Sequence, residues 1–283
     1  MTSAEWSSPD PAPLRAEARG ENFPVASLLL ARRVRPHVVA FYNFVRAADN
    51  VADDSGLAPA DKLAALERFE RALAEPLSPG APAEARSLAA SAARTGAGIE
   101  EARLLLDAFR QDATKWRYAD HGELVDYCRR SADPVGRYLL RLHGEDEADF
   151  AASDALCTAL QVLNHLQDCG EDYRRLDRVY LPLDLLERHG ARVEDLARPH
   201  ATPALRAALA ELLARVEVDL TRAQELPSRL RYRRLRWEAA AILGNARGLC
   251  RLLCRRDPLA TRVAQSASGK LLWALGGALG VLR

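Results

Sequence analysis

One segment organises the chain, Gln161-Val162-Leu163-Asn164-His165-Leu166-Gln167-Asp168-Cys169-Gly170-Glu171-Asp172. Asn164, Asp168 and Asp172 recur every four residues, a spacing that places them on one helix face with Cβ atoms about 5–6 Å apart. Gln161 lies one short turn earlier, and the intervening residues are largely apolar. An amide and two carboxylates are costly to bury on such a helix, so a hard cation with oxygen ligands, such as Mg²⁺, is indicated. The alternative is a solvated acidic face paired with Arg174 and Arg175.

A second acidic strip occurs earlier in the chain. Asp49 and Asp53 are also four residues apart, and they follow the apolar and aromatic run of residues 38–45. Arg46 precedes Asp49 by three residues and is expected to project near it. Two carboxylate strips that each continue an apolar helix predict a metal cluster clamped between two facing helices.

Composition favours a helical protein and gives no signal for a nucleic-acid partner. Of the 283 residues 48% are hydrophobic, and Ala and Leu outnumber the β-branched types, which favours helices. The 40 Lys and Arg residues balance 39 Asp and Glu residues. We find no internal repeat and no convincing strand, so one all-α domain is expected.

Cysteine usage and hydropathy bear on the compartment. The 5 cysteines form no CxxC pair and no secretion signal is evident, which indicates reduced thiols in a cytoplasmic protein. No apolar run reaches the roughly 20 residues that span a bilayer. Residues 271–282 come nearest, and they are either a short interfacial anchor or a last helix packed on the bundle. The arginines of residues 229–236 indicate a solvated helix start, with contact to anionic lipid or diphosphate as the alternative.

Periodicity divides the chain into a mobile N-terminus (1–20), a helical domain (21–260) and a C-terminal tail (261–283). Arg35-Pro36 begins the helix of the earlier strip, with Pro36 in its first turn, and residues 184–203 form short helices and loops. Other predicted helices cover residues 61–74, 84–95, 99–117, 151–172, 205–225 and 230–256.

Three further features carry predictions. Gln111, Lys115 and Tyr118 fall on one side of the end of the predicted helix 99–117, as a strip suited either to a diphosphate or to a solvated helix end. Asp133-Pro134 and Gly136 predict a bend between helices, where small residues leave room for a bound molecule against the backbone. His165 is expected to be packed or hydrogen-bonded rather than a metal ligand.

Four motifs follow one another between about residues 20 and 260. They are Arg46-x-x-Asp49-x-x-x-Asp53, Tyr127-Cys128 followed by Pro134-Val135-Gly136, Gln161-x-x-Asn164-x-x-x-Asp168-x-x-Glu171-Asp172, and Tyr180-Leu181-Pro182. In this order they resemble the squalene/phytoene synthase family of isoprenoid synthases. The resemblance implies an all-α isoprenoid synthase bundle around a central apolar cavity, with Mg²⁺ (or Mn²⁺) and diphosphate at its mouth.

The resemblance also implies individual roles. The four strip aspartates and Tyr127 would be catalytic. The metal ligands would be Asp49, Asp53, Asn164, Asp168 and Asp172. Substrate binding would fall to Tyr42, Arg46, Gln161, Asn164, Lys115, Tyr118, Val135 and Gly136. Metal ions and Arg46 would neutralise the departing diphosphate, and an aromatic-lined pocket would shield the carbocation from stray water.

Departures from the family pattern indicate a subgroup. Asn22-Phe23-Pro24 stands where many condensing members carry serines, and Glu21–Ser27 looks like the hydroxysqualene synthase branch of bacterial hopanoid pathways. In that branch presqualene diphosphate is ionised, the cation rearranges and water captures it, and a flavoprotein partner then reduces hydroxysqualene. Asn50, Gln167 and Asp133 stand where Asp, Arg and Asn are frequent in the family or branch.

We therefore expect a Mg²⁺-dependent hydroxysqualene synthase that acts on a prenyl diphosphate lipid, with peripheral contact at the inner membrane face. No Gly-rich nucleotide fingerprint occurs, so no NADPH is expected. One alternative is condensation of two prenyl diphosphates to presqualene diphosphate, squalene or phytoene. The other is a catalytically silent prenyl-binding or assembly partner, which the four retained aspartates disfavour.

Overall fold

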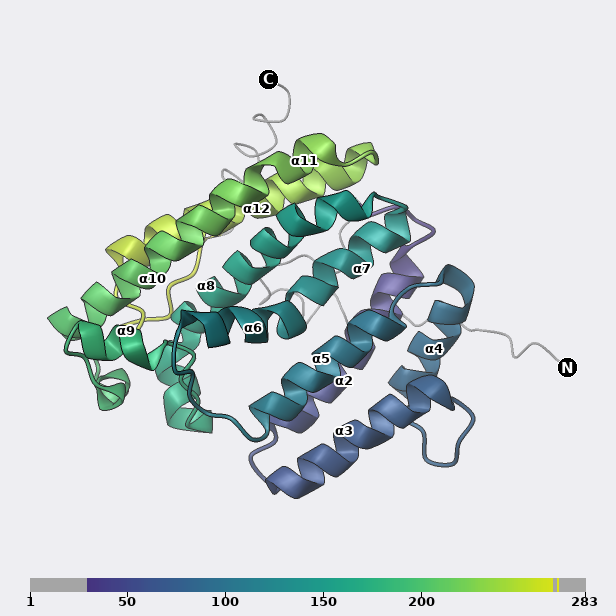
Figure 1. Cartoon of the computed structure of the whole chain (residues 1–283), viewed down its shortest axis with the longest axis horizontal. Helices are drawn as coiled ribbons and strands as arrows, with labels where there is room; N and C mark the ends of the chain where they lie inside the picture. The colour runs from purple at the N-terminus through teal and green to yellow at the C-terminus, as the bar shows by residue number, and fades with distance from the viewer. Residues whose placement is uncertain (1–29, 267–268, 270–283) are drawn as a thin grey trace, which may run out of the picture. The chain divides into compact units, whose positions relative to one another are not determined.

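The computed structural model describes residues 30–266 and residue 269 (Figure 1). The predicted N-terminus 1–20, the Glu21–Ser27 signature and the apolar run 271–282 lie outside the described residues. Contacts divide the chain into two compact units, which are described separately. Among the described residues, the first unit comprises 30–114 and Arg137–Glu147, and the second comprises Lys115–Gly136, 148–266 and 269.

The first unit is a small helical bundle centred on α2. Its complete helices are α2 (Arg35–Asp53), α3 (Pro59–Ala74), α4 (Ala83–Thr95) and α5 (Ile99–Asp112). Figure 1 shows α3, α4 and α5 beside α2, and each of the three packs against it. Phe44 and Leu66 are fully buried between them. The Tyr138 ring stacks on Phe41 with centroids 4.0 Å apart, and its hydroxyl donates to the His37 carbonyl at 2.9 Å.

Local sequence explains where α2 begins and ends. Pro36 occupies its first turn, as predicted, because a proline there gives up no helical hydrogen bond. At the other end the Lys62 ammonium donates to the Ala52 carbonyl at 2.8 Å. Carbonyls of a last helical turn lack helical partners, so this cation stabilises the turn that ends at Asp53.

The second unit is built around α8 (Phe150–Leu176), a helix of 27 residues. Figure 1 shows α10 and α12 along α8, and α8 packs against both and also against α6. Leu163 and Leu166 are fully buried in this core. The other elements wholly within this unit are α6 (His121–Ser131), α9 (Leu183–Arg188), η2 (Val193–Ala197), α10 (Pro203–Arg222), η3 (Ala223–Glu225), α11 (Leu226–Arg229) and α12 (Arg233–Arg255).

Two elements cross the division between the units along the chain. α7 (Asp133–His143) begins in the second unit and ends in the first, and η1 (Glu147–Asp149) also spans a unit boundary. α6 ends at Ser131 and α7 begins at Asp133, so the predicted break before Asp133-Pro134 is confirmed. The domain boundaries at residues 20 and 260 remain predictions.

The all-α prediction is confirmed for the described residues, but the predicted helices 99–117 and 151–172 end elsewhere. α8 continues to Leu176. α5 ends at Asp112 rather than near residue 117. The chain turns at Ala113 and Thr114 and then runs extended, where the Val179 amide donates to the Trp116 carbonyl at 2.9 Å. This pairing with a segment far along the chain, an isolated parallel bridge at Arg117 and Val179, replaces further helical bonds.

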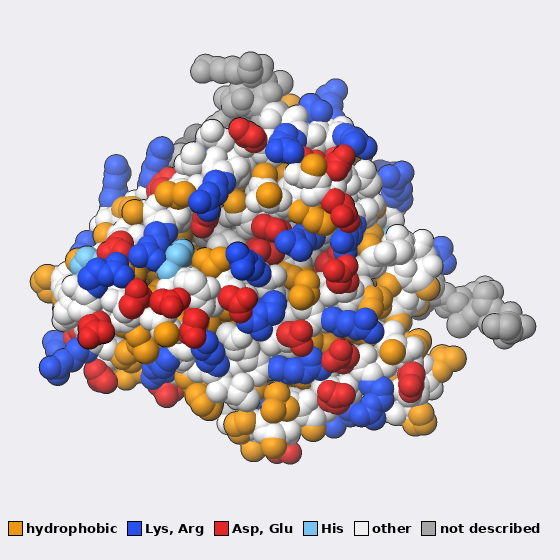
Figure 2. Space-filling view, in the orientation of Figure 1, with side chains coloured by type: hydrophobic (Ala, Val, Ile, Leu, Met, Phe, Trp, Pro, Cys, Tyr) orange, Lys and Arg blue, Asp and Glu red, His pale blue; other side chains and the backbone are white. Residues whose placement is uncertain are grey.

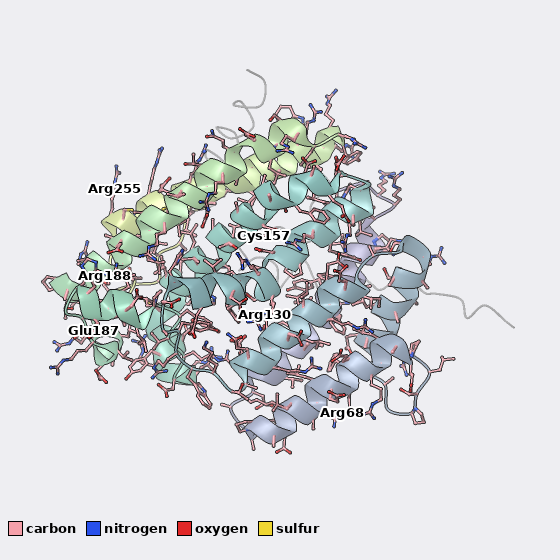
Figure 3. The ribbon with its side chains drawn as sticks, viewed as in Figure 1. Arg68, Arg130, Cys157, Glu187, Arg188 and Arg255 are labelled. Atoms are coloured by element: carbon pink, nitrogen blue, oxygen red, sulfur yellow. The ribbon has the colours of Figure 1, made fainter. Side chains whose placement is uncertain are left out.

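Surface charges are locally paired. Figure 2 shows Lys and Arg side chains interleaved with Asp and Glu over the visible face. Arg188, labelled in Figure 3, illustrates the pattern, because it forms ion pairs with Asp184 at 2.8 Å and with Glu211. Opposite charges on this face therefore lie next to one another.

Candidate functional site: two carboxylate strips

The first strip lies on the last turns of α2. Asp49 and Asp53 are half-buried, and Tyr42 lies half-buried two turns before Asp49 on the same helix. The Arg46 guanidinium donates from Nη1 to Asp49 Oδ2 at 2.9 Å. The predicted neighbourhood of Arg46 and Asp49 is therefore confirmed, and it arises wholly within one helix.

The second strip lies on α8. Gln161, Asn164, Asp168 and Asp172 are all half-buried, whereas Leu163 and the other apolar flanks are buried. The strip therefore lies partly exposed beside the buried apolar side of the helix. The helix ends at Leu176, soon after Asp172, because the next residue, Asp177, has a left-handed backbone (φ 51°).

A later segment of the second unit covers part of this strip. Arg262 donates to both carboxylate oxygens of Asp168, from Nε at 2.9 Å and from Nη2 at 3.3 Å. The predicted alternative pairing with Arg174 and Arg175 is wrong for Asp168, because Arg175 pairs instead with the exposed Glu171 at 3.2 Å.

Two residues near Asp168 on α8, Gln167 and Gly170, also contact the segment around Arg262, through Val263 and Leu259. The buried Gln167 amide donates to the Val263 carbonyl. At Gly170 an added Cβ would lie 2.7 Å from Leu259 Cδ2, so only glycine allows Leu259 to pack this closely on α8. Gln167, which stands where the family often has Arg, thus serves here to hold a backbone carbonyl.

An aromatic cluster lies beside the second strip. Tyr118, Tyr127 and Tyr180 are buried, with ring centroids 5.4–5.5 Å apart. His165 stacks on Tyr180 at 3.5 Å and lies 5.9 Å from Tyr127. Burial, with a smaller contribution from the Arg178 charge, lowers the pKa of His165 to about 3, so the ring is neutral at pH 7. The predicted packing of His165 is confirmed.

The predicted polar strip of Gln111, Lys115 and Tyr118 does not form one helical face. α5 ends at Asp112, so the later two residues follow the extended chain and belong to the second unit. Lys115 Nζ donates to Glu123 Oε2 at 2.8 Å and lies 5.0 Å from the centroid of the Tyr118 ring. The ion pair with Lys115 and the Ala119 amide lower the pKa of Glu123.

The first turn of α7, which contains Gly136, packs closely on side chains of α8. A Cβ on Gly136 would lie 2.4 Å from Ser153 Oγ and 2.7 Å from Cys157 Sγ, which is labelled in Figure 3. The expected room at Gly136 is therefore taken up by close helix packing, while the neighbouring Val135 is half-buried. Asp133 is also used in packing, since its Oδ1 accepts from the Thr158 hydroxyl at 2.9 Å.

The donors of the two strips suit a hard divalent cation. They comprise carboxylate and amide oxygens, and the half-exposed Asp49 and Asp168 carboxylates are held by arginines that a metal ion would compete with. Among the described residues no three His, Cys, Asp or Glu side chains gather closely enough to hold a metal ion. Each strip alone offers two carboxylates, and a metal cluster held by both strips stays a prediction.

Local spacing did not reveal the contribution of Arg262. It lies 94 residues after Asp168, and no pattern in the sequence joins the two. Gly170 carried a usable signal, because a glycine inside a helix often marks close approach by a neighbour.

No helix within the described ranges is long and apolar enough to cross a membrane.

Comparison with known proteins gives consistent matches. The squalene/phytoene synthase family model matches residues 16–269. A hydroxysqualene synthase of Sinorhizobium fredii is 45% identical over 91% of this chain and 88% of its own length. One of Rhodopseudomonas palustris is 46% identical over 87% and 83%. The solved structure of the squalene synthase HpnC from Alicyclobacillus acidocaldarius is 32% identical, with a TM-score of 0.73 over 86% of this chain and 92% of that one.

Proposed function

The chain belongs to the squalene/phytoene synthase family, and from this premise we propose that it converts presqualene diphosphate and water into hydroxysqualene and diphosphate. The observation that carries the proposal is the 45–46% identity to hydroxysqualene synthases over most of both chains. Membership makes the chain an isoprenoid synthase, and the two intact carboxylate strips support an active one. The condensing alternative is not favoured by these relatives.

Prenyl diphosphate synthases of this class generally use a divalent metal ion, and we propose Mg²⁺. Asp49, Asp53, Asn164, Asp168 and Asp172 would hold it. When bound, Mg²⁺ supplies a Lewis acid for the diphosphate oxygens. Both strips carry the oxygen ligands that Mg²⁺ prefers, and they are open enough to exchange an arginine for a metal.

The remaining roles fall to groups of this chain. Arg46 is exposed beside Asp49, where its guanidinium can neutralise charge on a leaving diphosphate. The rings of Tyr118, Tyr127 and Tyr180 can exclude water and offer π faces to a carbocation. Tyr42, Lys115, Gln161 and Val135 are proposed substrate-binding positions.

The test is product analysis with purified protein, presqualene diphosphate and Mg²⁺, with and without NADPH. We expect hydroxysqualene in both arms, because we propose that a separate flavoprotein reductase performs the later reduction. Farnesyl diphosphate offered alone tests the condensing alternative. Unchanged presqualene diphosphate, together with presqualene diphosphate made from farnesyl diphosphate, would overturn the proposal.

We also propose peripheral membrane contact, because the substrate is lipid-like and Arg231, Arg233 and Arg234 are exposed at the start of α12. Clustered arginines attract anionic headgroups by roughly 1 kcal/mol each near the surface. Flotation with phosphatidylglycerol vesicles should recover the protein at low salt and lose it at high salt. Absence of the protein from the vesicle fraction at low salt would contradict this contact.

A further inference from the structure

The proposed reaction needs one water molecule in a pocket that must otherwise exclude water. A water molecule is held in an apolar place only where polar partners are available to it. The strip carboxylates are assigned to the metal and Arg46 to diphosphate, so they are poor candidates for holding a nucleophilic water. A different polar group beside the aromatic cluster is therefore required.

His165 is such a group. It follows Gln161 by four residues and precedes Asp168 by three, which places it on the face of the second strip. Its ring lies against Tyr180, with an interplanar angle of 15°, and near Tyr127. Its Nε2 is buried, and no described residue offers it a hydrogen bond. Buried polar atoms without partners are uncommon and call for an explanation.

We propose that His165 Nε2 positions the water molecule that captures the carbocation; this inference rests on the proposed function. In the tautomer with an unprotonated Nε2, the imidazole accepts a hydrogen bond from the water, whose oxygen lone pair then faces away from the ring. A C–O bond forms between this oxygen and the carbocation. The water O–H bond breaks, and its proton passes to the diphosphate released in the same turnover. His165 remains neutral throughout.

Other buried atoms of the second unit fit this role less well. His121 Nδ1, Ser131 Oγ, Asp184 Oδ1 and Asn245 Oδ1 also lack hydrogen-bond partners among the described residues. His121 and Ser131 lie on α6, Asp184 on α9 and Asn245 on α12, so none of them lies on the helix that carries the second strip. Of the residues that the structure describes, only His165 combines an unpartnered buried atom, a place on the face of the second strip and a stack on a tyrosine.

The test replaces His165 with Phe, which keeps a ring to stack on Tyr180 and removes both nitrogens. With presqualene diphosphate and Mg²⁺ we expect substrate consumption of the same order as in the wild type. The hydroxysqualene share of the products should fall about tenfold, the value of one well-placed hydrogen bond. Products without an oxygen from water should take its place. His165→Gln, which can still bind water, should recover part of the share.

The matched control is His200→Phe, the same substitution at a surface histidine whose side chain is 75% exposed. It should leave both the rate and the product share unchanged. Thermal unfolding of each variant verifies folding, and His165→Leu replaces His165→Phe if the latter does not fold.

The two proposals fail in different ways. An unchanged hydroxysqualene share in the folded His165→Phe or His165→Leu protein overturns the role of His165 and leaves the proposed function standing. A wild-type protein that makes no hydroxysqualene contradicts the proposed function itself. A parallel loss of rate with an unchanged share would indicate a structural role only, and would also overturn the inference.

Discussion

The strips on α2 and α8 have the same four-residue spacing and are held in different ways. On α2 the Asp49 carboxylate is bound by Arg46, three residues away on the same helix. On α8 the Asp168 carboxylate is bound by Arg262, which lies 94 residues later. Equal spacing in sequence therefore produced one strip with an arginine partner on its own helix and another with an arginine partner in a distant segment.

The two ion pairs alone do not explain why the strips are held differently. Side-chain exposure is 46% and 32% for Arg46 and Asp49, and 57% and 28% for Arg262 and Asp168. Ion pairs this exposed are worth only about 0–1 kcal/mol. What distinguishes α8 is the additional attachment through Gln167 to Val263, which is buried. The second strip is thus joined to the segment that reaches it.

The largest effect should come from removing one charge from either strip. Asp49→Asn and Asp168→Asn keep the side-chain shape and should each lower consumption of presqualene diphosphate by at least about 100-fold, the scale of losing one electrostatic contact to a departing group. Single-turnover assays at saturating Mg²⁺ measure the loss. Asp107→Asn, an exposed position on α5, is the control and should retain activity.

Unequal losses would sharpen the comparison. If Asp49→Asn were active and Asp168→Asn were not, the chemistry would depend on the α8 strip alone, and the metal role of the α2 strip would be wrong. Full activity in both would leave the proposed roles of both strips without support.

The next effect concerns the anchoring of α8. Gln167→Leu removes the donor to the Val263 carbonyl and leaves a buried acceptor unsatisfied, which should lower the free energy of unfolding by about 1–3 kcal/mol. Denaturant unfolding measures it. Asn50→Leu, on the exposed side of α2, should change stability by no more than about 0.5 kcal/mol. A Gln167→Leu protein as stable as the wild type would show that packing alone holds the segment.

Local sequence was enough to predict what a single helix decides. The spacing of Asp49 and Asp53, the apolar flanks of α8 and Pro36 in the first turn of α2 all follow from helical geometry, and the structure bears out these helices. The break before Asp133 was also predictable, because proline is favoured in the first turn of a helix and Asp133-Pro134 therefore marks a new helix start.

Long-range contacts decided what the sequence could not show. The helix expected to reach residue 117 ends at Asp112, because the chain after it pairs with Val179. The expected space at Gly136 is taken by Ser153 and Cys157, since a glycine signals close approach without naming the neighbour. Arg262 escaped notice for the same reason, because nothing near Asp168 in sequence identifies its partner.

The smallest expected effect is a difference in backbone hydrogen exchange between the Arg262→Ala and Arg46→Ala proteins. Arg262→Ala should speed hydrogen exchange of backbone amides in residues 259–265 by up to about fivefold, matching an exposed ion pair worth about 0–1 kcal/mol. Arg46→Ala should leave exchange in α2 unchanged, because the helical hydrogen bonds and the Lys62 contact to Ala52 remain. About 1 M salt shortens the screening length to about 3 Å and should bring the wild type towards the Arg262→Ala rate. Equal exchange in the two proteins at low salt would mean that Gln167 and the buried Leu259 and Val263 hold the segment by themselves, so that Arg262 is free to leave Asp168 at little cost.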